Sequence, residues 1–204
     1  MEDRIKSAAE IAMEKVAKMA KLTPEEARDL KWVPEGERIA ALYLRGEVDL
    51  AKALKSLDRA AFPSVLKGMV SILLPNLGIP KNDADAVTDR RAAEALPILC
   101  RDRKALELIL GQVAQVQRQH ASYGKQLLEK SYQELKQRFM AQIQQKLEQQ
   151  RVRAPSVRVD IDSMPEFQAQ WRATAARIEQ QYEPRLERFR EQLRELVLAK
   201  PAFP

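Results

Sequence analysis

The residues best suited to chemistry in this sequence are its only cysteine, Cys100, and its only histidine, His120. Without a second thiol there is no internal disulfide, and the clusters of thiolate and imidazole that bind zinc are missing. Arg101 and Arg103 would favour a thiolate at Cys100, but no base lies near it in sequence. We therefore expect Cys100 to be a small packing residue and His120, which falls in an apolar helical stripe, to be packed and hydrogen-bonded.

Two acidic segments resemble parts of cation sites. Asn82–Asp85 begins like a calcium-binding loop and Glu94 stands at the position of its final glutamate, but Thr88 replaces the required glycine. We expect these acids to cap a helix instead. Asp160 and Asp162 alone are too few to hold magnesium without a substrate phosphate. Because a glycine-rich phosphate loop is also missing, we predict no metal, no cofactor and no small-molecule ligand, and hence a protein that is not an enzyme.

The strongest chemical signal is positive charge in the second half of the chain. Residues 1–87 contain 14 basic and 14 acidic residues, whereas residues 88–204 contain 21 and 15, so the whole formal charge of +6 lies after residue 87. A basic group that can contact phosphates or carboxylates is formed by Lys146, Arg151, Arg153 and Arg158. We predict that these four residues bind a partner.

Composition favours helices. Aromatic residues make up only 5% of the 204 residues and there are six glycines, while helix-forming residues such as Ala, Leu, Glu and Gln are abundant. The apolar content of 45% is enough for a core. We therefore predict an all-α protein.

Helix start and stop signals are frequent in the first half. An apolar stripe at three- and four-residue spacing predicts a helix over Asp3–Lys21. Thr23–Glu26 has the pattern of a capping box with proline at the first helical position. Gly46 is placed to end that helix, Asp49 to cap the next one, and Pro63 to begin another. These short helices predict a bundle over residues 1–96.

Long helices are predicted in the second half. Ile98 to Gln150 contains no proline and only two glycines, which permits a helix of roughly 50 residues with an apolar seam over Leu106–Leu147. The seam shifts by one residue at Leu127 and Leu128. A second stripe, Phe167–Leu196, follows a capping box that begins at Ser163, and we expect a bend at Pro184.

The two stripes predict an antiparallel, coiled-coil-like helical hairpin over residues 97–204, with a connector at 151–162. Within the connector, residues 157–162 alternate as a strand does, so they form a short strand on the protein's own helices or pair with a second subunit or a partner. A row of glutamates can pair with lysines across the hairpin or with arginines of its own helix: Glu179, Glu183, Glu187 and Glu191.

The predicted function is that of a non-enzymatic helical interaction or scaffold protein. In this prediction the basic hairpin tip is presented to a macromolecular partner or to a second copy of the chain. The most apolar stretch, Val65–Leu74, is too short to span a membrane, and we expect a cytoplasmic protein. The alternative is a nucleic-acid-binding accessory protein that uses the basic hairpin. A third hypothesis is an enzyme whose carboxylates and lysines are brought together only by the fold.

Overall fold

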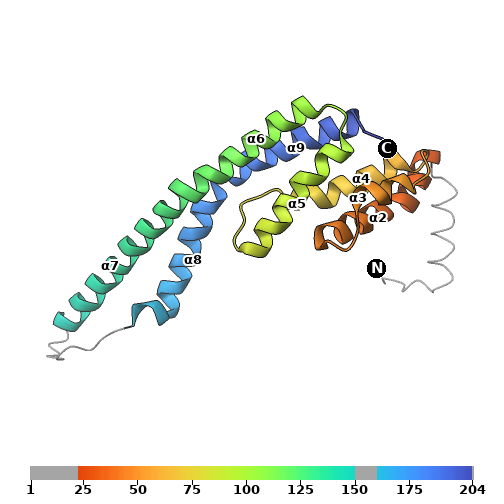
Figure 1. Ribbon diagram of the computed structural model, residues 1–204. Helices are drawn as coiled ribbons and strands as arrows, with labels where there is room; N and C mark the ends of the chain where they lie inside the picture. The colour runs from red at the N-terminus through yellow and green to blue at the C-terminus, as the bar shows by residue number, and fades with distance from the viewer. Residues whose placement is uncertain (1–22, 150–159, 204) are drawn as a thin grey trace, which may run out of the picture. The chain divides into compact units, whose positions relative to one another are not determined.

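The computed structural model describes residues 23–149 and 160–203, and most of these are helical (Figure 1). In these ranges the structure contains no strand, and its one element of β-pairing is an isolated antiparallel bridge between Cys100 and Pro201. The predicted all-α class is therefore confirmed. Within the described residues, 23–108 together with 190–203 form one compact unit, and 109–149 together with 160–189 form a second. The predicted domains, 1–96 and 97–204, stay a prediction.

The described helices have the following bounds, in chain order. Up to residue 99 they are α2 (Pro24–Arg45), α3 (Leu50–Lys55), α4 (Phe62–Leu73), the 3-10 turn η1 (Leu74–Asn76) and α5 (Asp83–Leu99). The later ones are α6 (Arg103–Gln119), the π-helical turn η2 (His120–Gly124), α7 (Lys125–Gln149), the 3-10 turn η3 (Ile161–Ser163), α8 (Pro165–Gln180) and α9 (Glu183–Ala199).

Local capping signals in the first unit are confirmed. The Thr23 hydroxyl accepts a hydrogen bond from the Glu26 amide at 3.2 Å, and the Glu26 carboxylate accepts one from the Thr23 amide at 2.7 Å. Gly46 ends α2 with φ of 80°, in the left-handed region that favours glycine. Asp49 caps α3, and Asn82 caps α5 by accepting from the Asp85 amide at 2.9 Å. The acidic segment around Asn82 thus starts a helix, as expected.

The core of the first unit is built on α4, which packs along α2. Eight of the twelve residues of α4 are buried. The two helices approach closely where glycines remove the side chain: a Cβ atom at Gly68 would lie only 2.0 Å from the carbonyl oxygen of Val33. Leucines of α3 and α5, among them Leu54 and Leu96, complete this core.

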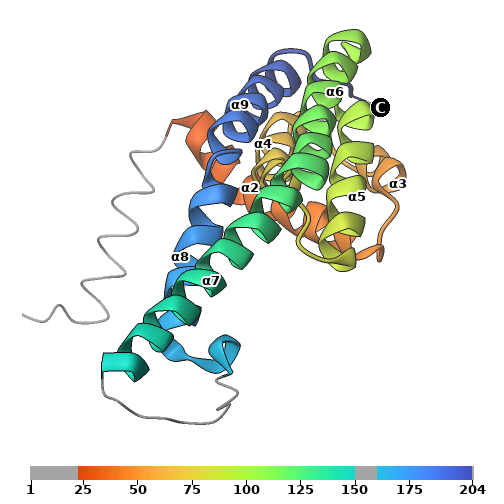
Figure 2. The same ribbon diagram turned by 90° about the vertical axis from the view of Figure 1, so that its left-hand side faces the viewer.

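In the second unit, α7 and α8 lie side by side (Figure 1 and Figure 2). Their contact is an aromatic cluster in which Phe139 and Phe167 meet with ring centroids 5.4 Å apart. Tyr132 makes T-shaped contacts with Phe167 at 5.5 Å and with Trp171 at 5.0 Å. Ile161 of η3 is buried in the same cluster.

Three expectations for the second half are corrected. The chain is helical from Arg103 to Gln149, as the long helix requires, but the π turn His120–Gly124 adds one residue and shifts the expected apolar seam, within which Tyr123 is 66% exposed. The capping box at Ser163 is wrong: Met164 is the N-cap of α8, and the Ser163 hydroxyl donates to the Asp160 carbonyl instead. Ile161–Ser163 is a 3-10 turn rather than part of a strand. Residues 157–159 lie outside the described ranges.

Charge pairs form within α9 and within α7. Arg194 lies 3.4 Å from Glu191, one turn away in α9, and Lys130 lies 3.9 Å from Glu134 in α7. Lys136 pairs with Asp162 at 2.6 Å and not with the predicted row of glutamates. The expected helix break near Pro184 is confirmed, because α8 ends at Gln180 and α9 begins at Glu183.

Candidate anion-binding pocket

Of the four predicted partner-binding residues, only Lys146 lies in the described part of the chain. Its side chain is exposed in the last turn of α7. Arg151, Arg153 and Arg158 lie outside the described residues. The partner-binding role of this group stays a prediction.

Cys100 and His120 are both buried. Cys100 is 1% exposed, and burial raises the pKa of its thiol, so the thiol is protonated at neutral pH and acts as a packing residue. The His120 ring packs against Tyr182 in a T-shaped contact at 5.1 Å. Its Nε2 has no hydrogen-bond partner within the residues that the structure describes, so the expectation of a hydrogen bond is wrong for this atom. Burial lowers the pKa of His120.

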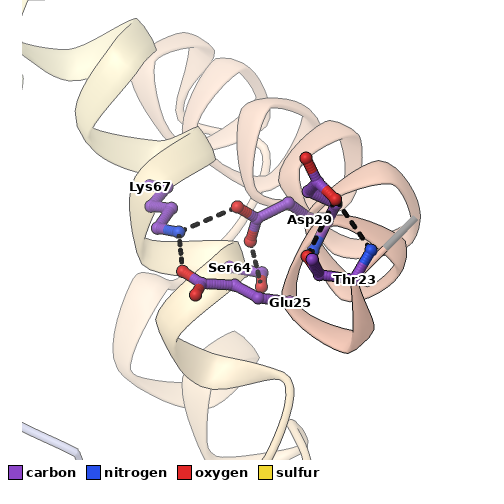
Figure 3. Close-up of polar contacts among 6 residues, drawn as sticks. Thr23, Glu25, Asp29, Ser64 and Lys67 are labelled. Carbon is purple, nitrogen blue, oxygen red and sulfur yellow. Dashed lines mark hydrogen bonds and ion pairs between the residues drawn. The ribbon is translucent and has the colours of Figure 1, made fainter. Parts of the chain in front are cut away.

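A polar cluster joins α2 to α4 (Figure 3). The Ser64 hydroxyl donates to Asp29 at 2.5 Å, and the Lys67 ammonium donates to Asp29 at 2.8 Å and to Glu25 at 2.9 Å. The third hypothesis, an enzyme, requires a group of carboxylates and a lysine of this kind. However, the hydrogen bond from Lys67 lowers the pKa of Asp29, and the hydrogen bond to Asp29 raises the pKa of Lys67. Both groups are charged at neutral pH, so neither is suited to take the Ser64 proton.

The first unit has an open pocket of about 850 Å³. Its apolar surface comes from the start of α4, the end of α9 and the residues that follow, namely Phe62, Pro63, Ala199, Pro201 and Phe203. Its charged surface includes five cations, Arg59, Arg101, Arg103, Lys104 and Lys200, and a single carboxylate, Asp102.

Backbone hydrogen bonds bring the C-terminal residues beside the turn between α5 and α6. The Arg101 amide donates to the Lys200 carbonyl at 2.9 Å, and the Ala202 amide donates to the Leu99 carbonyl at 2.8 Å. Phe203 then packs on Phe62 in a T-shaped contact at 5.0 Å. These contacts form the pocket from segments about 100 residues apart in sequence.

The single carboxylate of the pocket is already engaged. Asp102 accepts a hydrogen bond from Lys200 at 2.7 Å and one from the Ala105 amide at 3.2 Å, at the start of α6. The bond from Lys200 holds the pKa of Asp102 below its usual value. Across residues 23–149 and 160–203, no ion pair joins a carboxylate to any of the other four cations. The pocket therefore has an excess of positive charge that an anionic group can neutralise.

Sequence reasoning did not find this pocket because its cations are far apart along the chain. The available signal was the run Arg101–Lys104, which has three cations and one acid at a helix start. Arg59 and Lys200 have no such signal, since each joins the group only through the packing of α4 and the C-terminal segment.

In residues 23–149 and 160–203, no three His, Cys, Asp or Glu side chains are grouped so that they could hold a metal ion. None of the described helices combines the length and the apolar character that crossing a membrane requires.

The fold and the pocket define an all-α protein with a cationic pocket on one of its two units. The chain belongs to a family of unknown function (DUF6657), which matches residues 51–195. No curated protein and no solved structure matches it. The matched range includes Arg59 and the run Arg101–Lys104.

Proposed function

We propose that the chain is a non-enzymatic interaction protein that binds an acidic region of a macromolecular partner. The observation that carries this proposal is the excess of cations in one open pocket, four of which have no ion pair with a carboxylate in the described residues. Lys146, Arg151, Arg153 and Arg158 would add a second cationic surface. The partner is a protein or a second copy of the chain, in the cytoplasm.

A direct test measures binding of the full chain to polyglutamate. Polylysine, which has the opposite charge, is the negative control. The double variant Arg103→Gln with Lys104→Gln removes two pocket cations, and Lys52→Gln with Lys55→Gln removes two exposed cations of α3. We expect polyglutamate binding that weakens with salt and falls only in the pocket variant. Equal loss in both variants, or no binding at low salt, contradicts the proposal.

We also propose that residues 97–204 form the antiparallel, coiled-coil-like hairpin predicted above. It is supported by the contact between Phe139 of α7 and Phe167 of α8. Spin labels at the exposed positions Gln137 and Gln170 would test the pairing. A short, narrow distance distribution is expected in solution, whereas a broad one contradicts a paired arrangement.

The alternative function is that of a nucleic-acid-binding accessory protein, which the positive charge also favours. Within the pocket, Arg59 lies over the Phe203 ring, 5.8 Å from its centroid, so that face is not open to a stacking base. Binding of single-stranded and duplex oligonucleotides at about 50 mM salt decides between the two functions. Tight, strongly salt-dependent binding would favour this alternative.

The enzyme hypothesis has weaker support. The cluster of Asp29, Ser64 and Lys67 is its best candidate, but the charged states of the lysine and the carboxylate suit a structural ion pair better than catalysis. We propose that this cluster fastens α2 to α4.

A further inference from the structure

The pocket at the start of α4 and α6 has an apolar floor and a cationic rim. Phe62 is only 3% exposed, so its ring belongs to the floor, and Phe203, which packs on it, is 37% exposed. Arg59, Arg101 and Arg103 are exposed around this floor. A ligand that uses the whole pocket therefore has both an apolar part and negative charges beside it.

We infer, on the basis of the proposed function, that this pocket binds an acidic peptide segment that carries one large apolar side chain. The apolar side chain would contact Phe62 and Phe203, and flanking carboxylates would pair with Arg59, Arg103 and Lys104. A volume of about 850 Å³ is ample for one such side chain and its neighbours.

A phosphate group or a nucleic-acid backbone fits the pocket less completely. Phosphates would neutralise the rim but leave the apolar floor exposed to water, and burial of that floor is the additional free energy that an apolar side chain contributes. Base stacking on Phe203 is hindered because Arg59 lies over its ring and Phe62 contacts it. The floor is thus the feature that favours a peptide.

The test compares dye-labelled peptides by fluorescence anisotropy with the full chain. One peptide has a central phenylalanine flanked by glutamates on both sides, the second has alanine in its place, and a single-stranded oligothymidylate is the third probe. We expect the phenylalanine peptide to bind at least about tenfold more tightly than the alanine peptide, which corresponds to about 1.4 kcal/mol.

Two variants separate the contributions of floor and rim. Phe203→Ala is expected to remove most of the difference between the peptides, and Arg103→Gln with Lys104→Gln to weaken both. Lys52→Gln with Lys55→Gln, which carries the same loss of charge on α3, should bind as the native chain does. Circular dichroism and thermal unfolding verify that each variant is folded.

The outcomes distinguish this inference from the proposed function. The inference is overturned if the two peptides bind with equal affinity, or if their difference in affinity persists in Phe203→Ala. Either result remains compatible with the proposed function, binding of an acidic partner. Tighter binding of the oligothymidylate through Arg103 and Lys104 overturns it in favour of nucleic acid. Failure of both peptides to bind at low salt overturns the inference and the proposed function together.

Discussion

Gly36 of α2 lies directly against the backbone of α4 at Val65. A Cβ atom at Gly36 would lie 2.0 Å from the Val65 carbonyl oxygen, and Gly68 of α4 is placed in the same way against Val33 of α2. Each helix therefore contributes a glycine at which the other helix approaches its backbone.

The first prediction is that alanine at either glycine destabilises the protein. Gly36→Ala and Gly68→Ala force the two backbones apart, which we expect to cost about 1 to 3 kcal/mol. The matched control is Gly111→Ala in α6, where the added Cβ would meet no described atom within 4 Å apart from its chain neighbours and the backbone of its own helix. This control should stabilise the protein by about 0.5 to 1 kcal/mol through helix propensity. Urea unfolding followed by circular dichroism measures the free energy of unfolding of all three variants. If Gly111→Ala is destabilised as well, close packing of α2 and α4 does not explain the losses at Gly36 and Gly68.

The second prediction concerns the ion pair between α2 and α4. Asp29→Ala leaves the buried Ser64 hydroxyl without its acceptor, which costs roughly 1 to 3 kcal/mol. Asp29→Asn keeps an acceptor for Ser64 and should be more stable than Asp29→Ala. If the two variants are equally stable, the hydrogen bond from the Ser64 hydroxyl to Asp29 does not contribute to stability.

The same carboxylate has a defined effect on stability at acid pH. Because the pKa of Asp29 is lower in the folded protein, its contribution to stability is complete above the unfolded pKa of about 3.9 and is lost as the pH falls through the folded value. The stability difference between native protein and Asp29→Asn should therefore shrink at acid pH and stay constant between pH 5 and 7.

The third prediction follows from His120. Burial lowers its pKa, and of the two charges that act on it, Glu179 raises the pKa while Lys125 lowers it. The unfolded chain therefore binds a proton first, so stability falls as the pH decreases below about 6.5. His120 is the only histidine, and His120→Phe, which keeps a ring against Tyr182, should flatten the curve between pH 7.5 and 5.5. Urea unfolding midpoints at these pH values measure how stability changes with pH. If stability falls equally with decreasing pH in the native protein and in His120→Phe, His120 is not the origin of the pH dependence.

The fourth prediction concerns Asp162, which fastens η3 to α7. Its carboxylate accepts hydrogen bonds from Tyr132 at 2.5 Å and from Lys136 at 2.6 Å. Asp162→Ala removes both contacts and should speed amide hydrogen exchange at the start of α8. Asp160→Ala is the neighbouring control, because the hydrogen bond at that residue is accepted by its backbone carbonyl and its carboxylate acts on Lys136 only through its charge. Equal acceleration in the two variants would show that the side chain of Asp162 is not the fastening group.

Much of the fold could be predicted because it depends on residues close together in sequence. The Thr23 capping box, the left-handed Gly46 and the Asn82 cap each act over three or four residues, so their signals are complete in a short segment. Ser163 shows the limit of such signals: its hydroxyl satisfies the Asp160 carbonyl in the preceding 3-10 turn and does not cap α8. A local pattern fails where a second local structure holds the same side chain in another orientation.

By itself, the sequence determined the helical class, the helix starts and ends that carry local capping signals, and the excess of positive charge. The tertiary structure decided the pairing of Gly36 and Gly68 with opposite backbones and the gathering of Arg59, Lys104 and Lys200 around one apolar floor. The physical reason is the range of the interactions. Capping and periodicity act within a few residues, whereas close packing and the summed charge of a pocket depend on which distant segments meet.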